Sequence, residues 1–535
     1  MYEISIINGH VVDGTGNPWY KADIGIKDGR IDKIGKLEAY ADEIIDANGL
    51  IISPGFIDMH THSDLSIIVN PLAESKIRQG VTTEVIGNCG SSSAYPLKDG
   101  SYKEEIKKRY GIDIDWTTLK GYKNRIEKQG IALNIVPLVG LGTISTYIID
   151  NRTDGPNEQE LDDMKQLLHE AMKDGAFGAS NGNEVWNWAK RCDQRLIELI
   201  SVLREYNGIY TTHKRNEGDN VIDSVLEEIK ICEITGVPCH ISHHKHNGYE
   251  NWGTVSITLE LIDKARKRGI DITLDQYPYT ATGHGLLNLL PPWIRRKQFL
   301  ERVMLLKNKN IRKKIKREQI SSVSDGTQWY SQLKNSSTGD YMSIMISSIS
   351  DKNKNLLGKI IGKIAIDQGI DQWDFTFNLL SEEENVGIIR FSFSEEDIKT
   401  VMKHNLTMFG SDGSALAPYG VLSKGHPHPR NYGTYPRILG KYVREEKVIS
   451  IEEAIRKMTS YPAQRLRINN RGLIQEDKWA DIVIFDPFTI IDKATYEEPK
   501  KYPEGIEYVI VNGKIVIAEG EHQKVLPGRV IQRKI

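Results

Sequence analysis

The sequence predicts an α/β protein with a parallel sheet, because strand-like and helix-like segments alternate through the middle of its 535 residues. About 400 residues follow this rhythm, which fits a TIM (β/α)8 barrel with insertions better than a six-stranded open sheet. We therefore predict a barrel over residues 56–472. The apolar runs that predict its buried strands are Ile131–Pro137, Ile209–Thr212, Val237–Ser242, Ile270–Leu274 and Leu406–Gly410.

Both ends of the chain consist of short strand-like runs and tight turns. Asp28-Gly29 and Asn512-Gly513 each separate two apolar runs, which is a signal for a β-hairpin. Since this pattern flanks the long middle on both sides, we predict that residues 1–55 and 473–535 meet in one small β domain.

One segment of the middle interrupts the alternation of strands and helices. Residues 286–350 contain Pro291-Pro292-Trp293 and a basic stretch, Lys307–Arg317, that reads as a helix. We predict that this segment is an inserted subdomain that covers a site at the mouth of the barrel.

Charge and composition exclude several classes of protein. Lysine plus arginine total 70 and aspartate plus glutamate 72, a formal net charge of −2, so the chain lacks the basic field that nucleic-acid binding needs. Four cysteines without a C-x-x-C pair exclude a disulfide framework. No signal segment is visible, and the longest apolar stretch, Ile131–Gly142, is shorter than the ~20 residues of a membrane span. We expect a cytoplasmic protein without nucleic-acid or membrane partners, and the composition leaves its oligomeric state open.

The motif Gly55-Phe-Ile-Asp-Met-His-Thr-His62 is the sharpest chemical signal in the sequence. His60 and His62 are two residues apart on a predicted strand, so their side chains point to the same face. At the carboxyl end of a barrel strand this face is the mouth, where active sites lie. Because neutral imidazole is a good ligand for zinc, the pair predicts part of a metal site.

Four further polar residues, Cys89, His213, His243 and Asp412, each follow an apolar run. A thiolate, imidazoles and a carboxylate are suitable zinc ligands. A structural zinc site would usually be closed by four local ligands. Ligands spread over several strands therefore favour a catalytic site on a barrel.

These segments resemble the metal-dependent amidohydrolase superfamily and, within it, the N-acyl-D-amino-acid deacylases, or D-aminoacylases. The resemblance covers essentially the whole chain and implies a TIM barrel with a small β-sandwich built from both termini. Many other branches of the superfamily use a carboxylated lysine where this sequence has Cys89. The matching segments are Ser53–His62, Gly80–Gly90, Tyr210–Gly218, Ile241–Lys245, Asp275–Ala281, Gly410–Gly413, His428–Leu439 and Gly472–Pro487.

The resemblance also implies a role for each matching residue. It implies one tightly bound zinc and a second, weaker metal position, with Cys89 able to bridge them, and Asp412 as the catalytic acid and base. The expected ligands of the tight position are Cys89, His213 and His243, and those of the weaker one are His60 and His62. Contacts to the substrate and its carboxylate are expected from Lys245, Tyr277, Tyr279, Arg430 and Arg215.

The implied reaction is hydrolysis of a small-molecule N-acyl-D-amino acid. Zinc makes hydroxide available at neutral pH, and this hydroxide attacks the amide carbonyl. Asp412 takes the proton of the water and delivers it to the departing nitrogen, because an amine leaves poorly unless it is protonated. The products are a carboxylic acid and a D-amino acid.

Several departures from the family pattern predict an altered substrate pocket. Residues 140–142 read Gly-Leu-Gly where the family usually has Gly-His-Gly, Ser145 stands where arginine is frequent, and residues 282–285 also differ. We therefore expect Trp186 and Trp188 to contact the substrate. The acyl group and the side chain of that substrate stay open.

Other interpretations of the same residues are also open. The metal core would equally serve a hydrolase of cyclic amides or a deaminase, and a non-catalytic scaffold protein is a third reading. Asp412 could instead cap a helix, Lys245 could lie at the surface, and Arg430 could form a structural ion pair.

Overall fold

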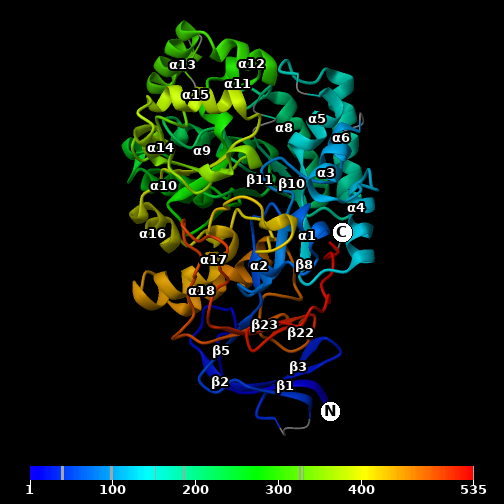
Figure 1. Ribbon diagram of the computed structural model, residues 1–535. Helices are drawn as coiled ribbons and strands as arrows, with labels where there is room; N and C mark the ends of the chain where they lie inside the picture. The colour runs from blue at the N-terminus through cyan, green and yellow to red at the C-terminus, as the bar shows by residue number, and fades with distance from the viewer. Residues whose placement is uncertain are drawn as a thin grey trace.

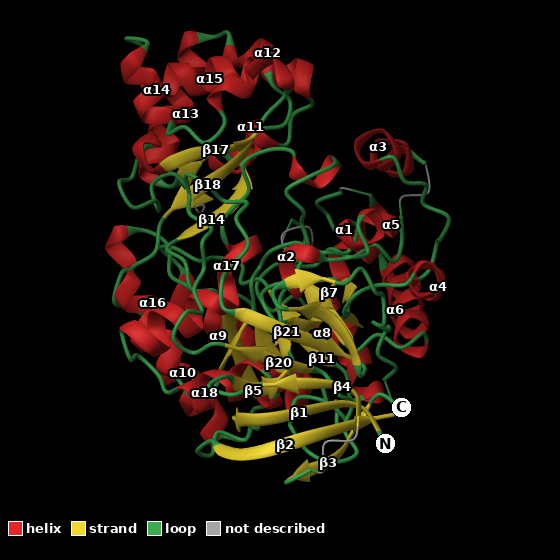
Figure 2. Ribbon diagram, turned by 60° about the horizontal axis from the view of Figure 1, so that its bottom comes forward, coloured by secondary structure: helices red, strands yellow, loops and turns green. Residues whose placement is uncertain are grey.

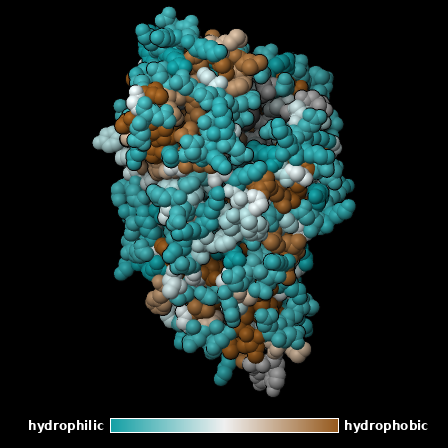
Figure 3. Space-filling model, in the orientation of Figure 1, coloured by the Kyte–Doolittle hydropathy of each residue, from teal (hydrophilic) through white to brown (hydrophobic). Residues whose placement is uncertain are grey.

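Strands from both chain ends lie at one end of the molecule, and a group of helices from residues 292–382 lies at the other (Figure 1). The computed structural model describes residues 1–37, 41–96, 100–150, 152–182, 185, 187–324, 327–328 and 331–533. The face shown in Figure 3 is mostly hydrophilic, with hydrophobic residues in small groups. No described helix combines the length and apolar character needed to cross a membrane.

In the described part of the chain, the sheet at the chain ends has nine strands in the order β23-β22-β21-β20-β5-β1-β2-β3, with β4 beside β1. The antiparallel pairing of β5 with β20, in which Ile52 lies opposite Ile484, joins the two ends of the chain. Their strands are β1 (Tyr2–Val11), β2 (Tyr20–Lys27), β3 (Arg30–Gly35), β4 (Ala41–Asp46), β5 (Ile51–Pro54), β20 (Ile482–Phe485), β21 (Ile506–Val511), β22 (Lys514–Ala518) and β23 (Glu521–His522).

The strands of the middle region run parallel and are buried throughout, as expected for a sheet covered on both faces. One sheet has the order β6-β7-β8 and the other β9-β10-β11-β12-β13-β19. Leu138 alone separates β8 from β9, and the Met59 amide donates to the carbonyl oxygen of Phe409 (3.3 Å), which links β6 to β19. These strands are β6 (Phe56–Asp58), β7 (Val81–Ile86), β8 (Asn134–Pro137), β9 (Val139–Gly140), β10 (Gly178–Asn181), β11 (Ile209–Thr212), β12 (Cys239–Ile241), β13 (Ile272–Gln276) and β19 (Thr407–Phe409).

Helices alternate with these strands, so the predicted α/β class is confirmed. The helix α6 shows why the chain turns helical there: the Asn157 side chain accepts from the Glu160 amide, and the Glu160 carboxylate accepts from the Asn157 amide. The helices around the parallel strands are α1 (Ser66–Val69), α2 (Glu74–Ile77), α3 (Ser101–Tyr110), α4 (Leu119–Gln129), α5 (Leu141–Ile149), α6 (Glu158–Lys173), α8 (Gln194–Ser201), α9 (Val221–Thr235), α10 (Val255–Lys267), α16 (Glu395–Lys403), α17 (Arg430–Arg437), α18 (Ile451–Met458) and α19 (Ser460–Arg465).

A separate unit lies between β13 and β19 and has its own apolar core (Figure 2). Its three-stranded sheet has the order β14-β18-β17, and the pairing of β14 with β18 brings residues 281–285 against 387–391. The unit is therefore longer than the predicted segment 286–350. Its elements are β14 (Ala281–Gly285), α11 (Pro292–Arg295), α12 (Phe299–Leu306), α13 (Lys309–Ser321), β15 (Val323–Ser324), β16 (Thr327–Gln328), β17 (Ile344–Ser348), α14 (Ile361–Asp367), α15 (Gln372–Glu382) and β18 (Gly387–Phe391).

A buried ion cluster fixes three of the parallel strands to one another. The Lys76 ammonium, on α2, donates to Asp58 (2.9 Å) and to the Ser411 hydroxyl, and it lies 3.5 Å from Glu84. The side chains of Lys76, Asp58 and Glu84 are fully buried. Asp58 ends β6, Glu84 lies in β7 and Ser411 follows β19, so a single ammonium holds the ends of three strands together.

Removing this ammonium would leave two buried carboxylates without a counter-charge. We expect Lys76→Met to lower the free energy of unfolding by ~3–5 kcal/mol, the cost of breaking a buried ion pair. Chemical denaturation would measure it, with the exposed Lys120→Met as control. An equal loss in both variants would contradict the role of the cluster.

Candidate metal centre

The thiol of Cys89 lies at the centre of the site, on a turn that only small neighbours allow. Cys89 has a left-handed backbone (φ 52°), and so does Gly90 (φ 79°). A Cβ atom on Gly90 would lie 2.8 Å from the amide nitrogen of Gly182, and one on Gly182 would lie 2.0 Å from the carbonyl oxygen of Cys89. The Asn-Cys-Gly sequence therefore serves to turn the chain sharply after β7 and to aim the sulfur at the neighbouring strands.

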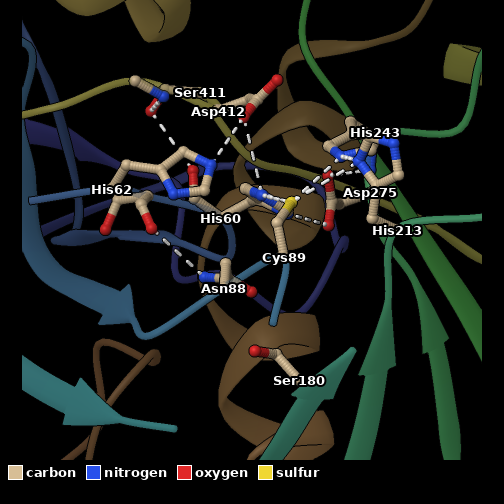
Figure 4. A network of polar contacts seen from close by, with 12 residues as sticks. His60, His62, Asn88, Cys89, Ser180, His213, His243, Asp275, Ser411 and Asp412 are labelled. Atoms are coloured by element: carbon tan, nitrogen blue, oxygen red, sulfur yellow. Dashed lines mark hydrogen bonds and ion pairs between the residues drawn. The ribbon is translucent and has the colours of Figure 1, made fainter. Parts of the chain in front are cut away.

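Three histidines from three strands surround this sulfur (Figure 4). The Cys89 Sγ atom lies 3.2 Å from His60 Nε2, 3.3 Å from His243 Nε2 and 3.7 Å from His213 Nδ1. His213 Nδ1 and His243 Nε2 are 3.0 Å apart. Ligands bound to one zinc at ~2.3 Å (sulfur) and ~2.0–2.1 Å (nitrogen) would be about 3.5 Å apart, so these spacings fit a shared metal ion.

Two groups of possible metal donors share Cys89: His60, His62 and Cys89 make one, and Cys89, His213 and His243 make the other. A third group, His60, His243 and Asp412, does not contain Cys89. Within each group the ligand atoms lie within 4.8 Å of one another. Burial alone would raise the pKa of the Cys89 thiol, but the imidazoles of His60 and His243 hold it well below its ordinary value. A thiolate is the form that binds metal, so the donor set suits zinc or a similar ion.

Asp412 lies beside both groups, after β19, and also has a left-handed backbone (φ 50°). Its Oδ1 atom is 3.1 Å from His62 Nε2, and its Oδ2 atom accepts a hydrogen bond from Arg430 Nη1 (2.8 Å). Burial would raise the pKa of this carboxyl, but Arg430 and the nearby imidazoles hold it well below the usual range. Asp412 is thus a carboxylate that lies next to the possible metal donors.

The structure adds Asp275, which sequence reasoning did not assign. Its Oδ1 atom accepts from the His243 amide (2.8 Å), and its Oδ2 atom lies 2.9 Å from His240 Nε2 and 3.5 Å from His60 Nδ1. A carboxylate behind a metal-ligating histidine fixes the orientation of its ring. Its signal in the sequence is its place at the start of the segment Asp275–Ala281, in which only Tyr277 and Tyr279 are predicted to have a role.

Glu217 is a second residue that the sequence did not reveal. Its Oε1 atom lies 2.9 Å from the Lys245 ammonium, 3.3 Å from the Lys214 ammonium and 3.1 Å from His243 Nδ1. Despite its burial, these neighbours hold the pKa of the Glu217 carboxyl well below its ordinary value. Glu217 therefore contacts both lysines and His243, one of the possible metal donors.

The predicted substrate residues do not all lie in the same place. Lys245 and Arg430 line the cavity beside the metal ligands, and both lie over the ring of Tyr277, at 5.6 and 4.8 Å from its centre. Tyr279 lies apart from that cavity wall, and its hydroxyl donates to Asp492 (3.3 Å). Arg215 lines the cavity but is paired with Glu227 (2.9 Å).

The cavity beside the donor groups has a volume of about 230 Å³. Part of its wall comes from the inserted unit, which supplies Thr282, His284 and Arg390. Its described lining residues are His62, Cys89, His213, Lys214, Arg215, Glu217, His243, Lys245, Thr282, Gly283, His284, Asn288, Gln332, Arg390, Asp412 and Arg430.

Of the two tryptophans expected in the pocket, Trp186 lies outside the described residues and Trp188 lies within them. Trp188 is buried, its indole N–H donates to the Ser145 hydroxyl (2.9 Å), and it does not belong to the described cavity lining. Ser145, one of the positions that differ from the family pattern, thus forms a hydrogen bond with Trp188.

Comparison with known proteins finds relatives that cover nearly the whole chain. The amidohydrolase family model matches residues 340–517. An N-acyl-D-glutamate deacylase and a D-aminoacylase, both from Alcaligenes xylosoxydans xylosoxydans, are each 32% identical over 99% of this chain, and 96% and 98% of their own lengths are covered.

Solved structures give the same picture. The N-acyl-D-glutamate deacylase of Bordetella bronchiseptica, in complex with zinc and a phosphonate inhibitor, superposes with a TM-score of 0.81 at 31% identity, over 99% of this chain and 100% of that one. A D-aminoacylase structure gives 0.81 at 29% identity, with both chains fully covered. The L-hydantoinase from Arthrobacter aurescens, at 14% identity and a TM-score of 0.55, covers 100% of both chains and shares the fold alone.

Together the fold and the donor cluster define an amidohydrolase. Within that class, the full-length relatives show that the chain belongs to the D-aminoacylase family. The resemblance seen in the sequence is confirmed.

Glu228 supports the strand that leads to His213 and gives a test by pH. It is fully buried, and the Thr212 hydroxyl donates to it (3.0 Å). Burial, together with the neighbouring Glu227, raises the pKa of its carboxyl from 4.5 to about 8. The folded protein thus keeps a proton that the unfolded chain releases, so this group makes the free energy of unfolding fall as pH rises from 4.5 to about 8.

We expect Glu228→Gln to flatten that fall, because glutamine has no proton to release. Urea denaturation at several pH values would measure it, with the exposed Glu170→Gln as the matched control. Parallel curves for wild type and Glu228→Gln would show that Glu228 is not protonated in the folded state.

Proposed function

We propose that this protein is a zinc-dependent hydrolase that cleaves the amide bond of N-acyl-D-amino acids. The single observation that carries the proposal is the shared thiolate: Cys89 belongs to two of the three donor groups, and Asp412 belongs to the third and lies 3.1 Å from His62. Relatives named as deacylases of N-acyl-D-amino acids, at 32% identity over the full chain, support the substrate class.

The two donor groups that share Cys89 suggest how zinc would be held. Cys89, His213 and His243 would form the tight position, and His60 with His62 the weaker one, with Cys89 shared. Zinc bound there would act as a Lewis acid on an amide carbonyl and would make water a better nucleophile at neutral pH. Asp275 would hold the rings of His60 and His240 from behind.

Asp412 would carry the protons of the reaction. Its carboxylate accepts the proton of the attacking water and then delivers it to the amide nitrogen, which leaves as an amine. Arg430 holds one carboxylate oxygen (2.8 Å), so the other oxygen is the one directed at the donor groups. The same atom that takes the proton can therefore return it without a change of rotamer.

We propose that Lys245 and Arg430, which both lie over the ring of Tyr277, bind the carboxylate of the substrate. Both are charged, line the cavity and lie over the same ring. The Tyr277 hydroxyl is buried without a hydrogen-bond partner among the described residues, and Tyr277 itself does not belong to the described cavity lining. Tyr279 and Arg215 are held by Asp492 and Glu227, which supports positioning roles for them.

The same proposal includes the architecture. The linked parallel strands from β6 to β19 would form the predicted (β/α)8 barrel over residues 56–472, since hydrogen bonds connect β19 back to β6. Residues 1–55 and 473–535 would form the small β-sandwich domain. The inserted unit would close the mouth, because it supplies Thr282, His284 and Arg390 to the cavity wall.

The test of this function is a hydrolysis panel that scores released amine. It contains N-acetyl and longer N-acyl derivatives of D- and L-amino acids, a dipeptide series and cyclic amides, each with and without a chelator. We expect chelator-sensitive, D-selective release from linear amides. No release from any linear amide by protein that retains zinc would contradict the proposal, and release from cyclic amides alone would redirect it.

Asp412→Asn removes the proton carrier while it keeps the size of the side chain. We expect kcat to fall by about 100-fold or more, as for the loss of a general acid and base, with zinc content unchanged. Asp263→Asn, an exposed carboxylate that pairs with His404, is the control. A kcat within a few-fold of wild type would assign the proton transfers to another group.

A further inference from the structure

Arg390 is a buried guanidinium in the wall of the cavity, and its partners are all neutral. It is 2% exposed and lies on β18, opposite Thr282 of β14. Its Nε atom donates to His284 Nε2 (3.1 Å), and its Nη1 atom donates to the carbonyl oxygens of Gln332 (2.8 Å) and Asn335 (2.9 Å). The Nη2 atom makes no hydrogen bond with a described residue.

The histidine beside it does not neutralise this charge. His284 Nδ1 faces the carbonyl oxygen of Gly285 (3.1 Å), so this nitrogen carries the proton and Nε2 accepts from Arg390. Burial and the nearby guanidinium lower the pKa of His284 to about 3. His284 is therefore neutral and orients the guanidinium rather than balancing it.

The other lysines and arginines of the cavity each have a carboxylate. Lys214 and Lys245 share Glu217 (3.3 and 2.9 Å), Arg215 pairs with Glu227 (2.9 Å), and Arg430 pairs with Asp412 (2.8 Å). Within the described part of the chain, no carboxylate lies within 4.0 Å of Arg390. A buried charge without a counter-ion is costly, so the geometry leaves a place for an anion that enters with the substrate.

We propose that Arg390 binds a second carboxylate of the substrate, so that this enzyme prefers amides that carry two carboxylates. The inference rests on the proposed function, in which Lys245 and Arg430 take the first carboxylate. The described lining carries five lysines and arginines, and the carboxylates that pair with them are three, Glu217, Glu227 and Asp412, so positive charge is left over for a dianionic substrate. The second carboxylate belongs either to the side chain of the amino acid, as in D-aspartate or D-glutamate, or to the acyl group, as in a succinyl amide.

Paired substrates of equal size separate the charge from the shape. The wild-type enzyme is assayed on three pairs of substrates. Two pairs are N-acetyl-D-glutamate with N-acetyl-D-glutamine and N-acetyl-D-aspartate with N-acetyl-D-asparagine. The third is N-succinyl-D-valine with the derivative in which an amide replaces the free carboxylate of the succinyl group. We expect kcat/KM to favour the extra carboxylate in at least one pair by about 10–100-fold, the effect of one charged hydrogen bond. The pair that shows it identifies which half of the substrate Arg390 contacts.

Variants then assign the preference to Arg390. We expect Arg390→Gln to reduce the ratio within that pair to near one and to act mainly through KM, and Arg390→Lys to restore part of it. Arg302→Gln is the matched control, because Arg302 is also buried in the inserted unit (3% exposed) and donates to two backbone carbonyl oxygens, yet lies outside the cavity lining. A ratio that is the same in wild type and Arg390→Gln would make Arg390 a clamp for residues 332–335 and overturn the proposal.

A binding measurement keeps this inference separate from the proposed function. Calorimetry on the zinc-loaded protein compares D-glutamate with D-glutamine, D-aspartate with D-asparagine, and succinate with succinamate. Tighter binding of an acid, lost in Arg390→Gln, would support the proposal even if no amide of the panel were hydrolysed. Hydrolysis of neutral and acidic amides at equal rates, with equal binding of acids and amides, would overturn it and leave the deacylase function standing.

Discussion

The negative charge of one sulfur atom is the constraint on which the rest of this site depends. Cys89 is partly exposed and lies among imidazoles that follow different strands, and those rings favour its thiolate form. Its left-handed backbone and the close approach of Gly90 to Gly182 fix its direction before any ligand binds. The strands must therefore meet at this point with little tolerance, and their packing follows from it.

Buried carboxylates next to the donor groups contact the histidines of the site and hold them in place. Asp275 contacts the imidazole of His240 and the backbone amide of His243, and Glu217 contacts Nδ1 of the His243 ring. Below them, Lys76 ties β6, β7 and the segment after β19 together. Arg390 differs from the other lysines and arginines of the cavity, because no carboxylate of the described residues pairs with it.

Much of this site follows from the sequence alone, because the metal donors sit at the ends of apolar runs and parallel strands end at the same edge. That reasoning places His60, His62, Cys89, His213 and His243 together, and the structure does so. It does not separate Tyr277, beside Lys245 and Arg430, from Tyr279, which bonds to Asp492, since both tyrosines share one short motif.

Contacts between distant segments are what the sequence leaves open. The pairing of β14 with β18 joins residues about 100 positions apart, which no local pattern predicts. This pairing carries Arg390 to the cavity and extends the inserted unit beyond residues 286–350. The partnership of Glu217 with Lys214, Lys245 and His243 likewise needs three-dimensional placement, because nothing in its own segment distinguishes it from a surface glutamate.

The most direct test of the account is the absorption spectrum of the cobalt-substituted protein. If the Cys89 thiolate binds the metal, the wild type shows a sulfur-to-cobalt charge-transfer band in the near ultraviolet. The account predicts that Cys89→Ser abolishes the band while Cys192→Ser, at a cysteine remote from the donor groups, keeps it. A band that persists in Cys89→Ser, or that is missing from cobalt-loaded wild type, would contradict the central claim.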